Sequence, residues 1–100
     1  MKQTFGEYIR ELRENQKMPL RKLAAILDVD QSTLSKIERN ERKAISEMVP
    51  ILAKTFNLDY KTLKIKFLSD NVVRYLSGED FPIEVLKVAE EQIEYLRKQK

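Results

Sequence analysis

The sequence contains no cysteine and no histidine. Without cysteine, the chain can form neither disulfide bonds nor thiolate metal sites. The two absences together also remove the commonest general bases, nucleophiles and transition-metal ligands of enzymes. The two glycines, Gly6 and Gly78, lie far apart, so no glycine-rich phosphate loop is present. We therefore expect no catalytic activity, no cofactor and no metal.

Long apolar runs and strand-like alternation are also missing. No run approaches the length needed to span a membrane, and residues 1–16 are charged throughout, unlike a secretion signal. We expect a cytoplasmic protein with no membrane partner. With so few glycines and little β-branched alternation, the chain favours helices over strands. Apolar residues make up 42% of its 100 residues, which is enough for one core.

Apolar residues spaced three and four apart predict an all-α fold with six helices. Thr4 and Glu7 fit a capping box at the start of the first helix. Ser46 and Asp59 are the expected N-caps of the fourth and fifth, and Gly78 should close the fifth. The expected helices cover about residues 5–16, 20–27, 31–39, 46–56, 60–76 and 82–97.

The second and third helices form the stretch around which the chain is organised. Their apolar residues, such as Leu23 in one and Leu34 in the other, would pack the two helices together. Between them, Asp28 can adopt a left-handed conformation, and Asp30 can cap the following helix. Two short helices joined by such a tight turn predict a helix-turn-helix.

The outward face of the third helix is polar and basic. Short or hydrogen-bonding side chains at the N-terminal end of such a helix can read base edges in the major groove. The candidate base-reading residues are Gln31, Ser32, Ser35 and Lys36. Nearby side chains would contact the DNA backbone and position the helix. These candidates are Arg21, Thr33, Arg39, Asn40, Arg42 and Lys43.

The charge distribution is consistent with this interpretation. The chain has a net charge of +3, and all of the excess lies in residues 1–57, whereas residues 58–100 are balanced. An excess this small also arises by chance, so charge supports DNA binding without deciding it.

The stretch LAAILDVDQSTLSKIERNER resembles the helix-turn-helix of the Cro/C1-type, or XRE, family of regulators. The pattern around Phe5, Gly6, Ile9 and Leu12 is similar to the opening of that family. This resemblance covers about residues 4–69. It implies a five-helix, lambda-repressor-like domain that binds operator DNA, usually as a homodimer. It also implies a structural ion pair between Arg13 and Glu38, which would tie the first helix to the third.

Three residues depart from the family pattern. Asp28 stands where glycine is usual, so a strained left-handed residue is expected in the turn. Pro19 replaces the usual Ser or Thr cap of the second helix. Leu20 replaces a glutamine that contacts phosphate, so this contact is either lost or moved to Arg21. The fold should survive all three changes, whereas the set of phosphate contacts is less secure.

Residues 70–100 lie outside the family core and form a C-terminal helical extension to the domain at residues 1–69. The extension contains seven acidic and five basic residues, which makes it a poor surface for binding DNA. Its last helix carries an apolar seam of two heptads: Leu86, Ala89, Ile93 and Leu96. This seam either pairs two subunits or folds back on the fifth helix. We expect fold-back combined with a shared interface.

The sequence favours a sequence-specific, dimeric DNA-binding transcriptional regulator, most readily a repressor. Two alternatives stay open. An antitoxin-type protein would bind a small protein partner through residues 70–100 and regulate itself through the same DNA-binding domain. A controller of a restriction–modification system would use the domain in the same way. The sequence does not separate these three functions.

Overall fold

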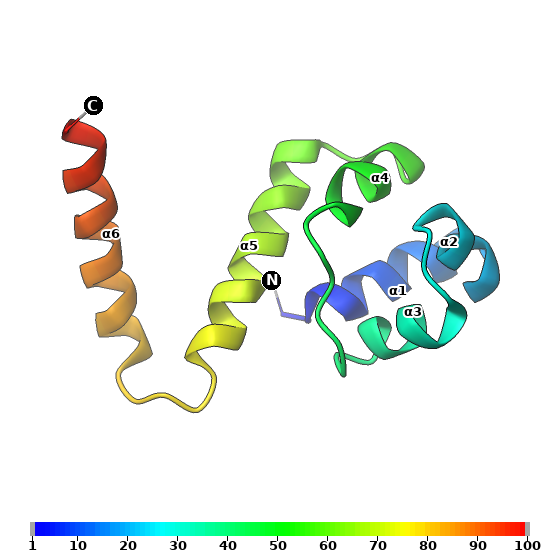
Figure 1. Ribbon diagram of the computed structural model, residues 1–100, viewed down its shortest axis with the longest axis horizontal. Helices are drawn as coiled ribbons and strands as arrows, with labels where there is room; N and C mark the ends of the chain where they lie inside the picture. Colours follow the sequence, from blue (N-terminus) through cyan, green and yellow to red (C-terminus); the bar gives the residue numbers. More distant parts are fainter. Residues whose placement is uncertain (1, 100) are drawn as a thin grey trace.

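The computed structural model describes residues 2–99, and within them the fold is all-helical. Its helices are α1 (Phe5–Asn15), α2 (Leu20–Ile26), α3 (Gln31–Glu38), α4 (Met48–Thr55), α5 (Tyr60–Leu76) and α6 (Pro82–Lys98). The first five gather into one globular unit, and α6 projects from it (Figure 1). The all-α fold class and the six predicted helices are therefore confirmed, with ends that differ by one or two residues.

Side-chain caps fix the starts of α1 and α5 as predicted. The Thr4 hydroxyl accepts a hydrogen bond from the Glu7 backbone amide, and the Glu7 carboxylate accepts one from the Thr4 amide. The Asp59 carboxylate accepts the backbone amide of Thr62 at the start of α5. Each cap satisfies backbone amides that have no partner within the helix.

The predicted cap of α4 is wrong. Glu47, rather than Ser46, precedes the first helical residue, and its side chain makes no capping bond. The Ser46 hydroxyl instead accepts a hydrogen bond from Lys64 Nζ of α5 at 2.8 Å. Residues 46 and 47 form a turn before the helix, so Pro50 falls in the first turn of α4, where a missing amide costs little.

The core lies between α1, α3, α4 and α5, and α2 contributes the buried residues Leu23 and Ala24 to it. Phe5 and Phe67 meet edge to face with their ring centroids 5.4 Å apart, which joins α1 to α5. Gly6 lets α1 approach the backbone of α3, because an added Cβ would lie 1.8 Å from the carbonyl oxygen of Ile37. The largest fully buried side chains are Phe5, Ile9, Leu23, Leu34, Ile37, Val49, Leu52 and Leu63.

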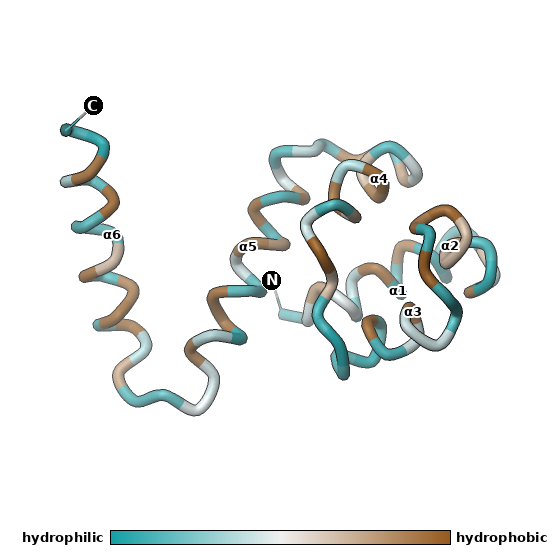
Figure 2. The backbone as a smooth tube through the Cα atoms, viewed as in Figure 1, coloured by the Kyte–Doolittle hydropathy of each residue, from teal (hydrophilic) through white to brown (hydrophobic). Residues whose placement is uncertain are grey.

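The C-terminal helix α6 contributes no residue to this core. It diverges from α5 after the turn at residues 77–81, with apolar positions along its length (Figures 1 and 2). The boundary expected between residues 69 and 70 lies inside α5, so the extension begins within a helix of the globular unit. None of the described helices is both long and apolar enough to cross a membrane.

Candidate DNA interface

The turn between α2 and α3 has the predicted chemistry. Asp28 adopts the left-handed conformation, with φ of 58°, where the family pattern has glycine. Two residues later, the Asp30 carboxylate accepts the backbone amide of Thr33 at 2.7 Å and caps α3. The buried residues Leu23 of α2 and Leu34 of α3 hold the two helices against the core. Local turn chemistry and packing together fix the direction of α3.

The candidate base-reading residues lie on α3, and their exposure fits that role. Gln31, Ser32 and Lys36 are exposed, and Ser35 is half-buried one turn from the helix start. Their side of α3 faces away from the core, whereas Leu34 and Ile37 are buried. The first turn of α3 therefore presents hydrogen-bonding side chains to solvent, an arrangement suited to base edges.

The capping carboxylate of Asp30 sits in a positive environment. The Thr33 backbone amide and hydroxyl stabilise its charged form, and this lowers its pKa below the ordinary value. The positive charges of Arg42 and Lys36 lower this pKa further. Arg42, from the loop after α3, and Lys36 thus both act on the start of the helix, where a negatively charged backbone would approach.

A family model described as Helix-turn-helix matches residues 9–63, more than half of the chain. This chain is a Cro/C1-type helix-turn-helix protein. No curated protein and no solved structure is significantly similar to it. As a member of this family, the helix-turn-helix protein is a DNA-binding transcription regulator, and α2 and α3 lie within the matched residues.

The residues that are candidates for contacts with the DNA backbone lie around α3, but they differ in exposure and in the hydrogen bonds they already make. Arg21, Arg42 and Lys43 are exposed. Arg39 pairs with Glu41 at 3.0 Å, and its Nε donates to the carbonyl of Ser35 at 3.3 Å. The last two of the candidates are Thr33, half-buried, and Asn40, exposed but hydrogen-bonded within the chain. Among the candidate cations that the structure describes, Arg21, Arg42 and Lys43 are exposed and make no ion pair.

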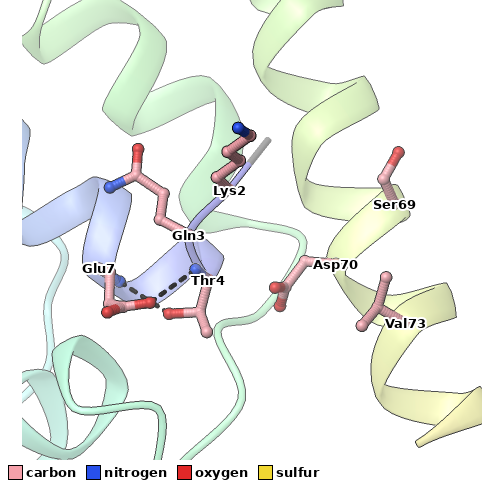
Figure 3. A pocket seen from close by; sticks show the side chains of 7 residues that line it. All are labelled: Lys2, Gln3, Thr4, Glu7, Ser69, Asp70 and Val73. Atoms are coloured by element: carbon pink, nitrogen blue, oxygen red, sulfur yellow. Dashed lines mark hydrogen bonds between the residues drawn. The ribbon is translucent and has the colours of Figure 1, made fainter.

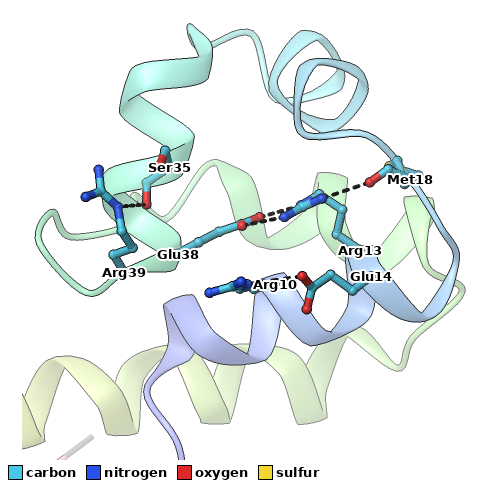
Figure 4. Close-up of polar contacts among 7 residues, drawn as sticks. All are labelled: Arg10, Arg13, Glu14, Met18, Ser35, Glu38 and Arg39. Carbon is cyan, nitrogen blue, oxygen red and sulfur yellow. Dashed lines mark hydrogen bonds and ion pairs between the residues drawn. The ribbon is translucent and has the colours of Figure 1, made fainter.

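The ion pair between Arg13 and Glu38 holds α3 against α1. Two guanidinium nitrogens of Arg13 donate to the two carboxylate oxygens of Glu38 at 2.8 and 2.9 Å, and a third donates to the Met18 carbonyl at 2.9 Å (Figure 4). Both side chains are largely buried, at 13% and 4% exposed. Bonding to Glu38 raises the pKa of Arg13 above its already high ordinary value. This bidentate pair joins α1, the following loop and α3.

A second polar connection joins α5 to the same unit, and sequence reasoning missed it. The Asp70 carboxylate accepts the backbone amide of Phe5 at 3.1 Å and pairs with Arg74 Nε at 3.2 Å. Arg74 also donates to the side-chain oxygen of Asn40, the left-handed residue that follows α3. Asp70 lies beside the start of α1, where a shallow pocket opens between the two helices (Figure 3).

A sequence signal for part of this connection did exist. Asp70 and Arg74 are four residues apart on a predicted helix, the spacing of a side-chain ion pair. Their outer partners, Phe5 and Asn40, lie 65 and 34 residues away in the chain. Helical spacing carries no information at that range. The C-terminal half of α5 therefore contacts the start of α1 and the segment that follows α3.

Proposed function

We propose that the protein is a sequence-specific repressor that binds operator DNA as a homodimer in the cytoplasm. Each subunit inserts the start of α3 into a major groove, and two half-sites lie about 34 Å apart on one face of the DNA. Gln31, Ser32, Ser35 and Lys36 read base edges. Six other residues hold the backbone: Arg21, Thr33, Arg39, Asn40, Arg42 and Lys43.

One observation carries this proposal. The exposed polar end of α3 lies on a helix whose opposite side is fully buried and whose end is held by the Arg13–Glu38 pair. A helix held in this way presents its side chains in a fixed direction, which discrimination between bases requires. Gln31 can donate to and accept from adenine in a bidentate pair, and Lys36 can reach guanine or a phosphate.

Selection of bound sites from random DNA tests the proposal directly. We expect enrichment of a two-fold symmetric motif whose half-sites are one helical turn apart. The Gln31→Ala variant should lose preference at one base position in each half-site, by about 1–3 kcal/mol. Gln99→Ala, which removes an exposed glutamine at the end of α6, is the matched control. Enrichment of no motif would contradict sequence-specific binding.

Arg42→Ala separates the two kinds of contact. We expect this variant to bind all sequences more weakly and to reduce the slope of log affinity against log salt by about one, because one phosphate contact is lost. The order of preference among sequences should stay unchanged. A changed base preference would reassign Arg42 from the DNA backbone to a base.

The exposed apolar surface of α5 and α6 favours a second candidate function. An antitoxin-type protein would cover this surface with a small toxin protein and use α3 to regulate its own synthesis. Purification of the chain from its native cell tests this candidate. A stoichiometric second protein that dissociates on mutation of α6 would support it, whereas a homodimer without that protein supports the repressor.

A further inference from the structure

Most of the exposed large hydrophobic side chains of the protein lie between residues 68 and 96. On α6, Leu86, Ala89, Ile93 and Leu96 follow one another at intervals of three and four residues, so they share one side of the helix. On α5, Leu68 and its neighbours one and two turns on, Val72 and Leu76, form a second apolar stripe. It lies away from the buried side that carries Leu63 and Phe67.

The two stripes face each other across an open groove of about 370 Å³. Leu68, Val72 and Leu76 line one wall, and Val85, Leu86 and Ala89 line the other. The helices diverge from their connecting turn, so the groove widens toward the end of α6 (Figure 1). There Ile93 and Leu96 are 56% and 54% exposed. A continuous apolar surface of this kind marks an interaction site.

We propose that α6 of a second copy of the chain fills this groove and packs antiparallel against α6 of the first. Charge favours this occupant. Glu79 and Asp80 lie in the turn before α6 and Glu84 lies in its first turn, whereas Arg97 and Lys98 lie in its last turn, after the acidic Glu90, Glu91 and Glu94. Antiparallel packing brings the acidic end of each helix to the basic end of the other, twice by symmetry. Parallel packing would bring like charges together.

The order of side chains along the stripe fits the same arrangement. Ala89 lies next to the middle of α6, where two antiparallel copies cross, and it is the smallest residue of the stripe. A small side chain at the crossing lets the helices approach closely. Leu86 and Ile93 lie one turn on either side, where larger side chains can interdigitate with those of the partner helix.

The α5 wall adds a second contact surface to this interface. Two heptads of α6 alone are too short to dimerise strongly. Specific interfaces bury about 800 Å² on each partner. A helix of 17 residues spans about 25 Å, and in the groove it contacts two helices of its partner along much of this length. Each copy thus covers both of the other's exposed stripes.

This pairing also sets the positions of the two recognition helices, an extension that rests on the proposed function. Asp70 and Arg74 connect α5 to Phe5 of α1 and to Asn40 behind α3. An interface that holds α5 against the partner copy therefore fixes each α3 relative to the other. The pairing itself does not depend on DNA, so its failure and the failure of DNA reading give different results.

Sedimentation equilibrium of the full chain tests the pairing. We expect a dimer at micromolar concentration, and Ile93→Glu should raise the dimer dissociation constant at least about 100-fold, because symmetry buries the substituted position twice. Val88→Glu is the matched control, since Val88 is 61% exposed on the same helix but lies off the stripe. Its dissociation constant should change less than about threefold. Both variants should keep their helical circular dichroism, since neither residue is buried.

The orientation can be tested with single cysteines, because the natural chain contains none. Ala89→Cys should form a disulfide-linked dimer under mild oxidation, since the two copies cross near this residue. Leu96→Cys, on the same stripe, should not, because antiparallel packing places the two positions about 21 Å apart, whereas parallel packing would bring them together. Efficient cross-linking of the Leu96→Cys variant would overturn the antiparallel arrangement.

Three other results would overturn the proposal. In the first, the unmodified chain is a monomer at all concentrations. In the second, the chain forms a dimer that Ile93→Glu does not weaken. In the third, the chain is a monomer and a different protein binds to α6. If random DNA yields no motif while Ile93→Glu still breaks the dimer, the proposed function fails and the pairing stands. If Ile93→Glu leaves the dimer intact while Gln31→Ala shifts base preference, the reverse holds.

Discussion

Ile37 in α3 and Ile93 in α6 are both isoleucines on the apolar side of a helix, yet one is 2% exposed and the other 56%. The difference lies in whether other helices of the chain pack against the side chain. Ile37 packs into a core that α1 and α2 close, whereas Ile93 lies where α6 has diverged from α5. Apolar periodicity determines which side of a helix needs a partner. It does not determine whether that partner belongs to the same chain.

The starts of the helices differ in the same way. Carboxylates and hydroxyls cap α1, α3 and α5, so these helices have stabilising bonds of their own as well as packing, whereas α2 and α4 have no side-chain cap and depend on packing. At the start of α6, Phe81 is in the left-handed conformation and makes no side-chain cap. The globular unit is thus stabilised locally and globally, and α6 depends more on whatever covers it.

The two glycines give the sharpest contrast between these regions. In the Gly6→Ala variant, the new Cβ would overlap the Ile37 carbonyl, and α1 would have to move away from α3. We expect a loss of about 4 kcal/mol or more in the free energy of unfolding. Gly78→Ala meets nothing within 4 Å and should cost only about 1 kcal/mol for its positive φ. Urea denaturation of both variants measures the difference, and equal losses would contradict it.

The two isoleucines provide a second test. Ile37→Ala should lower the free energy of unfolding by about 3 kcal/mol, because it leaves a cavity in a closed core. Ile93→Ala should change it by less than about 0.5 kcal/mol in dilute protein, where the chain is monomeric. At high concentration the same variant should lose stability through weaker association. A concentration-independent loss for Ile93→Ala would place that residue in the core of its own chain.

The ion pairs that Arg10 and Arg13 of α1 make with glutamates extend the comparison to charges. Arg13→Ala leaves the buried Glu38 carboxylate without its partner and should cost about 2–3 kcal/mol, somewhat less than for a fully buried pair. Arg10→Ala breaks an exposed pair with Glu14 and should cost about 0.5 kcal/mol or less. Thermal unfolding of both variants measures these losses. A cost for Arg10→Ala that matched that of Arg13→Ala would contradict a bracing role for Glu38.

How far the sequence predicts this molecule depends on the distance between the residues concerned. Asp28 and Asp30 were predictable because a turn and a cap depend on neighbouring residues, and both have the predicted conformations. The Ser46 cap was wrong, because α4 begins at Met48 and the Ser46 hydroxyl accepts a hydrogen bond from Lys64, 18 residues away. Likewise, the contacts of Asp70 with Phe5 and of Arg74 with Asn40 depend on how α5 crosses the unit, which no local pattern encodes.

In the candidate site, too, the features that depend on nearby residues were predictable and those that depend on distant residues were not. That Gln31 and Lys36 face outward followed from the helical spacing of their buried neighbours, and the structure leaves both exposed. The pairing of Arg13 with Glu38 spans 25 residues, and only the resemblance to a family suggested it. Contact with DNA itself lies beyond spacing and burial alike, so the base-reading roles stay predictions for the binding experiments.

Low pH should lower the stability that the capping carboxylates give to α1, α3 and α5, and this is the smallest of the expected effects. Hydrogen bonds at the caps lower the pKa of Glu7, Asp30 and Asp59 below their ordinary values of 4.5 for Glu and 3.8 for Asp. As pH falls below about 4.5, the unfolded chain binds protons that the folded chain still excludes, so stability is present above this range and decreases through it.

Asp30→Asn isolates one cap, because the asparagine side chain still accepts the Thr33 amide but does not titrate. We expect the free energy of unfolding of this variant to fall less steeply between pH 4.5 and pH 3 than that of the unmodified chain, measured by urea denaturation at each pH. Glu91→Gln, an exposed position on α6, is the matched control and should keep the original slope. An unchanged slope for Asp30→Asn would mean that the start of α3 gains nothing from its charged cap.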